Sequence, residues 1–146
     1  MYKKLSVMLL GLLAASGAVQ AEEILRPILL PRPPIVLLLK PDLVVDSIAD
    51  PIYVNASRTT QIQAVVQNIG RVASRSCFAT IRNQRTGATN TVLVPALAAG
   101  ASATLHFTLP GSVFQPDASL RVTVDSFYNV DESNERNNTR DYFRIG

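Results

Sequence analysis

The sequence predicts an all-β domain, an immunoglobulin-like β-sandwich of about seven antiparallel strands. Three observations support this prediction. From residue 42 onward, short segments alternate between apolar and polar residues, which is the pattern of a strand with one buried face. Turn-forming residues separate these segments at nearly even spacing, as they do in two-sheet sandwiches. No segment shows the 3.6-residue periodicity of an amphipathic helix.

The chain begins with the features of a secretory signal peptide, which we assign to residues 1–21. Lys3 and Lys4 precede an apolar run from Leu5 to Ala15, and small residues lead to Ala21. The run is much shorter than the ~20 apolar residues that a membrane-spanning helix needs. We therefore expect a product that does not span a membrane after cleavage and that is exported to the periplasm or the extracellular space.

Residues 22–40 form a proline-rich apolar arm or linker in this interpretation. Five prolines lie within residues 22–41, and they favour extended geometry over a helix. The run Ile35 to Leu39 is unusually apolar for a linker. It can pack on the following domain, act as a simple spacer or dock onto another protein.

The domain proper is predicted over residues 41–146, beginning with a strand from Leu43 to Ile48. In the next strand, residues 61–67, Ile62, Ala64 and Val66 face one side and glutamines face the other. The remaining predicted strands cover residues 76–82, 91–94, 103–109, 120–125 and 142–145. Turn signals at residues 68–70, 85–87, 99–100 and 110–111 separate them.

The sequence offers little for catalysis or for binding of nucleic acid. His106 is the only histidine, and alternation places it on the solvent side of its strand. Cys77 is the only cysteine, and alternation places it on a buried face, so we interpret it as a small apolar core residue. Without the signal peptide the chain carries 12 basic and 11 acidic residues, with no basic cluster. We therefore predict a non-enzymatic protein that does not bind nucleic acid.

A polar segment between the last two predicted strands is the main candidate site. It supplies six oxygen-bearing side chains at close spacing, namely Asp125, Asn129, Asp131, Glu132, Asn134 and Glu135. Calcium binds to such ligands, so a weak calcium site is one interpretation. The EF-hand pattern is absent, because Arg136 stands where that pattern requires glycine. A small hydrolase that uses Glu132 and Glu135 as acid and base is a third, weaker interpretation.

A structural role explains more of these residues, and we prefer it. Asn and Asp side chains accept hydrogen bonds from nearby backbone groups and tolerate left-handed backbone. Asn134, Asn137 and Asn138 would then hold the connection together. Asp125, with Glu132 or Glu135, would accept backbone N–H groups across the loop, and Val130 would enter the core. On this interpretation the segment is a clasp that needs no cofactor.

Several motifs resemble the CARDB family, the cell-adhesion-related domain found in bacteria. They are Pro41-Asp42-Leu43-Val44-Val45, Val66-Gln67-Asn68-Ile69-Gly70, Leu97-Ala98-Ala99-Gly100-Ala101-Ser102, Val124-Asp125 and the run from Asn129 to Asn138. The resemblance covers residues 41–146 and is most specific in the last motif. It implies an immunoglobulin-like sandwich, a bacterial exported protein and a role in adhesion or extracellular binding. The family has no catalytic residues to carry over.

These observations predict an exported binding or adhesion-related module that recognises a protein or a glycan. The alternative is a structural or accessory subunit of a bacterial envelope assembly, held through the proline-rich arm.

Overall fold

The computed structural model describes residues 38–146, and these form a two-sheet β-sandwich. The predicted signal peptide (1–21) and most of the predicted arm (22–40) lie outside the described residues. The described part contains eight strands: β1 (Leu43–Ile48), β2 (Ile52–Val54), β3 (Thr59–Asn68), β4 (Cys77–Asn83), β5 (Thr89–Val94), β6 (Ser102–Pro110), β7 (Ala118–Val124) and β8 (Thr139–Arg144). The predicted all-β sandwich is confirmed.

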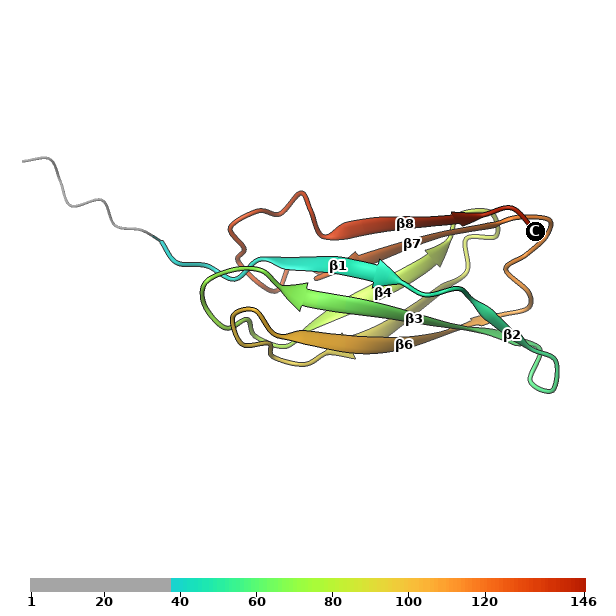
Figure 1. Ribbon diagram of the computed structural model, residues 1–146, viewed down its shortest axis with the longest axis horizontal. Helices are drawn as coiled ribbons and strands as arrows, with labels where there is room; N and C mark the ends of the chain where they lie inside the picture. The colour runs from blue at the N-terminus through green and yellow to red at the C-terminus, as the bar shows by residue number, and fades with distance from the viewer. Residues whose placement is uncertain (1–37) are drawn as a thin grey trace, which may run out of the picture. The chain divides into compact units, whose positions relative to one another are not determined.

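All strand pairs are antiparallel. In the first sheet, β3 is central: it pairs with β1 and β2 along one edge and with β6 along the other. The second sheet has the order β5-β4-β7-β8. Figure 1 shows the strands of both sheets running along the long axis of the sandwich.

Alternating side chains build the core between the sheets, because successive residues of a strand point to opposite faces. Ile62, Ala64 and Val66 of β3 are buried, as their spacing predicts. The largest fully buried side chain is Phe107 of β6. On the facing sheet the strands β4 and β7 contribute Cys77, Ala79, Ile81, Ala118, Leu120, Val122 and Val124.

The structure corrects several details of the predicted strands. Strands β3, β5 and β7 each begin two residues earlier than predicted. Residues 52–54 form β2, which the sequence pattern does not predict because a three-residue strand is too short to show alternation. Strand β7 ends at Val124, so Asp125 belongs to the following loop. Strand β8 begins at Thr139, earlier than predicted. Its first three residues are polar and exposed, so they show no alternation from which a strand could be predicted.

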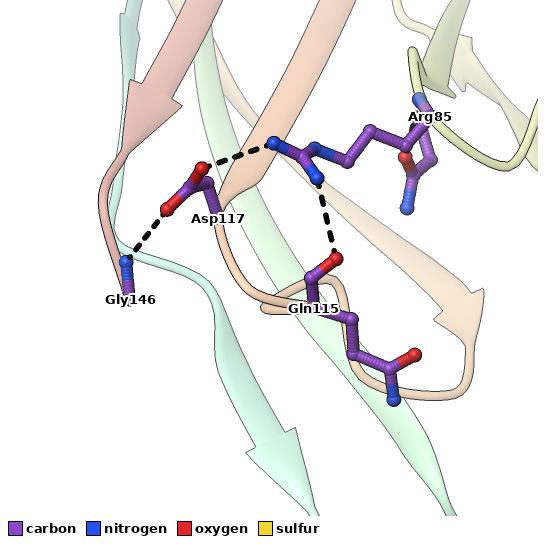
Figure 2. Close-up of polar contacts among 5 residues, drawn as sticks. Arg85, Gln115, Asp117 and Gly146 are labelled. Atoms are coloured by element: carbon purple, nitrogen blue, oxygen red, sulfur yellow. Dashed lines mark hydrogen bonds and ion pairs between the residues drawn. The ribbon is translucent and has the colours of Figure 1, made fainter.

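The two ends of the sandwich are held differently. The segment before β1 and the C-terminus lie at opposite ends (Figure 1). Near the C-terminus, Arg85 pairs with Asp117 at 3.0 Å and donates to the carbonyl oxygen of Gln115, while the backbone nitrogen of Gly146 donates to Asp117 (Figure 2).

Within residues 38–146 there is no helix of the length and apolarity that a membrane span requires.

Neighbouring residues of β6 offer a direct test of this packing. Phe107→Ala removes a fully buried ring and should lower the free energy of unfolding by about 3–5 kcal/mol. His106→Ala changes an exposed side chain and should stay within about 0.5 kcal/mol of the parent. Urea unfolding measures both values, and similar losses would contradict the assigned strand faces.

Candidate functional site

The loop from Asp125 to Asn138 joins β7 to β8, and Asp125 fixes how it starts. The backbone of Asp125 is left-handed, with φ of 47°, a conformation that Asp adopts more readily than most residues. Its side chain is buried and accepts the backbone N–H groups of Asn129 and Val130, both at 2.9 Å. These bonds direct Val130 into the core, where it is 5% exposed.

Glu132 connects this loop to the start of β1. Its carboxylate is buried and accepts the backbone N–H of Leu43 through one oxygen and the Asn138 amide, at 2.6 Å, through the other. Burial raises the pKa of Glu132 to about 7, and the neighbouring charges of Glu135 and Asp125 add to the rise. The two hydrogen bonds act in the opposite direction because they stabilise the carboxylate.

A second buried side chain, Asn68, holds the same segment from the other sheet. Its Oδ1 accepts the backbone N–H groups of Asp42 and Gly70, and its Nδ2 donates to the carbonyl oxygens of Val72 and Leu97. Asn68 thereby uses all four of its hydrogen-bonding positions. The sequence predicts Asn68 only as part of a turn.

Gly70 is required where residues 40–42 cross this turn. A Cβ atom at Gly70 would lie 2.5 Å from the backbone nitrogen of Asp42 and from the carbonyl carbon of Pro41. Only glycine permits such a close approach of two backbone segments. This explains the glycine of the Asn68-Ile69-Gly70 motif.

Three of the six predicted ligands come together. Asp125, Glu132 and Glu135 each place a carboxylate oxygen within 4.8 Å of the others, and Glu135 also accepts the backbone N–H of Glu132 at 2.9 Å. The other three predicted ligands are exposed and take separate roles or none. Asp131 pairs with Lys40 at 2.6 Å, Asn134 accepts the backbone N–H of Arg136 at 3.1 Å, and Asn129 contributes its backbone to Asp125.

The backbone hydrogen bonds expected of a clasp are therefore present, with one correction. Asn134 bonds to the backbone as predicted. Asn137 and Asn138 instead donate to the carboxylates of Asp42 and Glu132. Asp42 is far from Asn137 in the sequence, and Glu132 is buried by tertiary packing, so rules for local turns predict neither contact.

The only cysteine and the only histidine of the chain lie elsewhere. Cys77 is buried, and burial, together with the charge of Asp125, raises the pKa of its thiol to about 12. His106 lines a pocket of about 280 Å³ that also contains Asp50, which is already engaged by Tyr142 and Arg144. The volume of this pocket lies at the lower limit of typical ligand sites, which are ~300–1,000 Å³. Glu132 and Glu135, the acid and base of the hydrolase interpretation, do lie close together, but Cys77 is not among the residues that line the pocket beside His106.

Comparisons with known proteins agree with this architecture. The sequence profile of the CARDB family matches residues 40–141. Residues 272–376 of a protein assigned to the cell surface of Methanosarcina acetivorans are 28% identical, with a TM-score of 0.62, covering 74% of this chain and 92% of that one.

The CARDB domain of PF1109 from Pyrococcus furiosus, solved in complex with di-metal ions, is 23% identical, with a TM-score of 0.58, covering 73% and 88% of the two chains. Its solution structure gives a TM-score of 0.53, with 74% and 96% covered. Among curated proteins, none matches this chain.

Two carboxylates of the loop should differ sharply in their effect on stability. Asp125→Ala leaves two backbone N–H groups without an acceptor and places alanine in a left-handed backbone. It should cost about 2–4 kcal/mol. Asp131→Ala removes only a surface ion pair and should cost at most about 1 kcal/mol. Urea unfolding compares the two variants, and equal losses would argue against the clasp.

The raised pKa of Glu132 predicts a pH-dependent stability. Between the ordinary carboxyl pKa of 4.5 and the native value of about 7, only the folded protein holds the proton, so the free energy of unfolding should fall as pH rises through this window. Glu132→Gln should remove that contribution, whereas Asp131→Asn should retain it. Unfolding curves from pH 4 to 8 with a chelator present test this, and parallel profiles for parent and Glu132→Gln would contradict it.

Proposed function

This chain belongs to the CARDB family, a cell-surface-associated domain of bacteria and archaea, and we propose that it is an exported, non-enzymatic module that binds a protein partner. The proposed binding surface lies on the outer face of the sheet β5-β4-β7-β8. The observation that carries the proposal is a group of exposed apolar side chains at one end of that face.

We call these four residues, Phe78, Leu93, Phe127 and Tyr128, the aromatic patch. Phe78 of β4 lies opposite Leu93 of β5, and its ring meets that of Phe127 edge to face at 5.6 Å. Leu93 and Phe127 are more than half exposed, and Tyr128 is 80% exposed. Phe78, Leu93 and Phe127 thus form a contiguous exposed apolar group, and such groups mark interaction sites more often than isolated residues do. Tyr128 follows Phe127 in the same turn.

The chemistry of the aromatic patch favours a protein over a glycan. Phe and Tyr are enriched at the centres of protein interfaces, where a polar rim surrounds them. Here Thr80 and Ser126 form such a rim, with their hydroxyls 2.9 Å apart. A leucine side chain contributes apolar area but cannot stack on a sugar ring.

The backbone of Tyr128 adds to this proposal. Its φ is 54°, a left-handed value that is rare for a bulky residue and costs free energy. Its backbone N–H donates to the carbonyl oxygen of Asp125 at 2.9 Å, which closes the tight turn. The clasp thus holds the backbone of Tyr128 in one conformation before any partner arrives, which lowers the backbone part of the entropic cost of binding.

A subunit of an envelope assembly, held through the arm of residues 22–40, is the second proposal. It is favoured by the way the last residues of the arm are anchored. Lys40 pairs with Asp131, and the carbonyl oxygen of Pro41 accepts the backbone N–H of Ser133. The arm would therefore leave the sandwich from a fixed point.

Substitutions in the aromatic patch test the first of these proposals. The double variant Phe127→Ala/Tyr128→Ala should weaken binding to the partner by at least about 30-fold, since interface aromatics contribute about 2 kcal/mol or more. Ile52→Ala is the matched control, because Ile52 is 64% exposed on the other sheet. The partner is first identified by cross-linking in the envelope fraction, then purified, and its Kd is measured by calorimetry.

Deletion of residues 22–37, which removes most of the proline-rich arm, is the complementary experiment. A module that binds through the aromatic patch should keep its Kd after this deletion, whereas a subunit held through the arm should lose its assembly while the sandwich stays folded. Unchanged binding by the double variant would overturn the proposed surface. Retention on purified envelope polysaccharide in place of any protein would overturn the proposed class of partner.

A further inference from the structure

We propose that the loop between β7 and β8 is a binding site for one hard divalent cation, best suited to Ca²⁺. The ligands are the carboxylates of Asp125, Glu132 and Glu135 and the amide oxygen of Asn138. This inference concerns the stability of the clasp and does not rest on the proposed partner.

The three carboxylates converge without a cation to balance them. Their nearest oxygens lie within 4.8 Å of one another, and Asp125 and Glu132 are both buried. None of the four ion pairs within residues 38–146 involves any of the three. Like charges held this closely in a partly dry site repel one another. A bound cation would attract all three carboxylates and so make the net electrostatic interaction favourable.

An unsatisfied buried oxygen is the independent sign of a ligand. Asn138 is only 7% exposed, and its Oδ1 has no hydrogen-bond partner. Its Nδ2 donates to Glu132 at 2.6 Å, so the amide group lies beside one of the three carboxylates. An orphaned acceptor is rare in a folded protein, and an amide oxygen is a good ligand for a hard cation.

The hydrogen bonds already made leave room for coordination. One oxygen of Glu135 accepts the Glu132 N–H, and each oxygen of Asp125 accepts a single backbone N–H. Each oxygen retains a second lone pair for a cation. The backbone bonds hold the carboxylates in place, so the site is largely formed before binding.

The kind of ligands selects the kind of cation. All four ligand atoms are oxygens, which suits Ca²⁺ or Mg²⁺ better than zinc or copper, since these prefer nitrogen and sulfur. Mg²⁺ demands near-ideal octahedral geometry, whereas Ca²⁺ accepts six to eight irregular ligands with water completing the shell. An irregular cluster on a loop therefore favours Ca²⁺.

A proton on Glu132 is the competing explanation for the orphaned oxygen. If the Asn138 amide were rotated, its Oδ1 could accept a hydrogen bond from a protonated Glu132. The proton and the cation would then exclude each other, which makes a basic pH the correct condition for the test.

The experiment is a Ca²⁺ titration of the whole protein at pH 8 after dialysis against a chelator. Free Ca²⁺ at about 100 times its Kd should raise Tm by about 10 °C. Tb³⁺ should bind in place of Ca²⁺, and its luminescence should be sensitised by nearby Tyr128 and quenched by added Ca²⁺. An equal concentration of Mg²⁺ should give a smaller rise in Tm.

Two variants locate the cation. Glu135→Gln keeps an oxygen that accepts the Glu132 N–H but removes one charge, and it should weaken Ca²⁺ binding about tenfold or more. Asp131→Asn, a change at an exposed neighbour, should bind like the parent. The proposal is overturned if Ca²⁺ up to about 10 mM shifts neither Tm nor luminescence, a range that includes the weak sites of extracellular modules. It is also overturned if Glu135→Gln binds as tightly as the parent.

Discussion

Two successive backbone N–H groups at the start of β1 are accepted by buried side chains, and the arrangement at this end of the molecule depends on them. Asn68, at the end of β3, accepts the N–H of Asp42, and Glu132, from the loop after β7, accepts the N–H of Leu43. A buried N–H without an acceptor is costly, so both side chains are confined to these positions. The first strand, the turn after β3 and the last loop are therefore held as one unit.

Holding the fold through buried carboxylates has an electrostatic cost that an apolar core does not have. Glu132 lies among groups that partly stabilise its charge, while burial and its acidic neighbours oppose that charge. A proton or a cation can relieve this conflict, and either one would make the stability of the clasp depend on its surroundings. Two residues of the aromatic patch, Phe127 and Tyr128, lie on the same loop as these carboxylates.

Sequence reasoning found most of the fold because alternation reports burial directly. β1 has the predicted bounds, and the inward faces of β3, β4 and β6 are the predicted ones. The site was only partly predictable, because residue types identified Asp125, Glu132 and Glu135 but not their partners. Glu132 and Leu43 are 89 positions apart, and no local rule connects them. Asn68 and Asn138 were read as turn formers, although their burial comes from tertiary packing.

The segment before β1 and the C-terminus lie at opposite ends of the sandwich, and this placement has a mechanical consequence. A pull applied through the segment before β1 and through the C-terminus would act along the long axis of the sandwich (Figure 1). β1 pairs antiparallel with β3, and β8 with β7, so the inter-strand hydrogen bonds lie across the direction of pull. Such tension would shear many bonds simultaneously instead of unzipping them one by one.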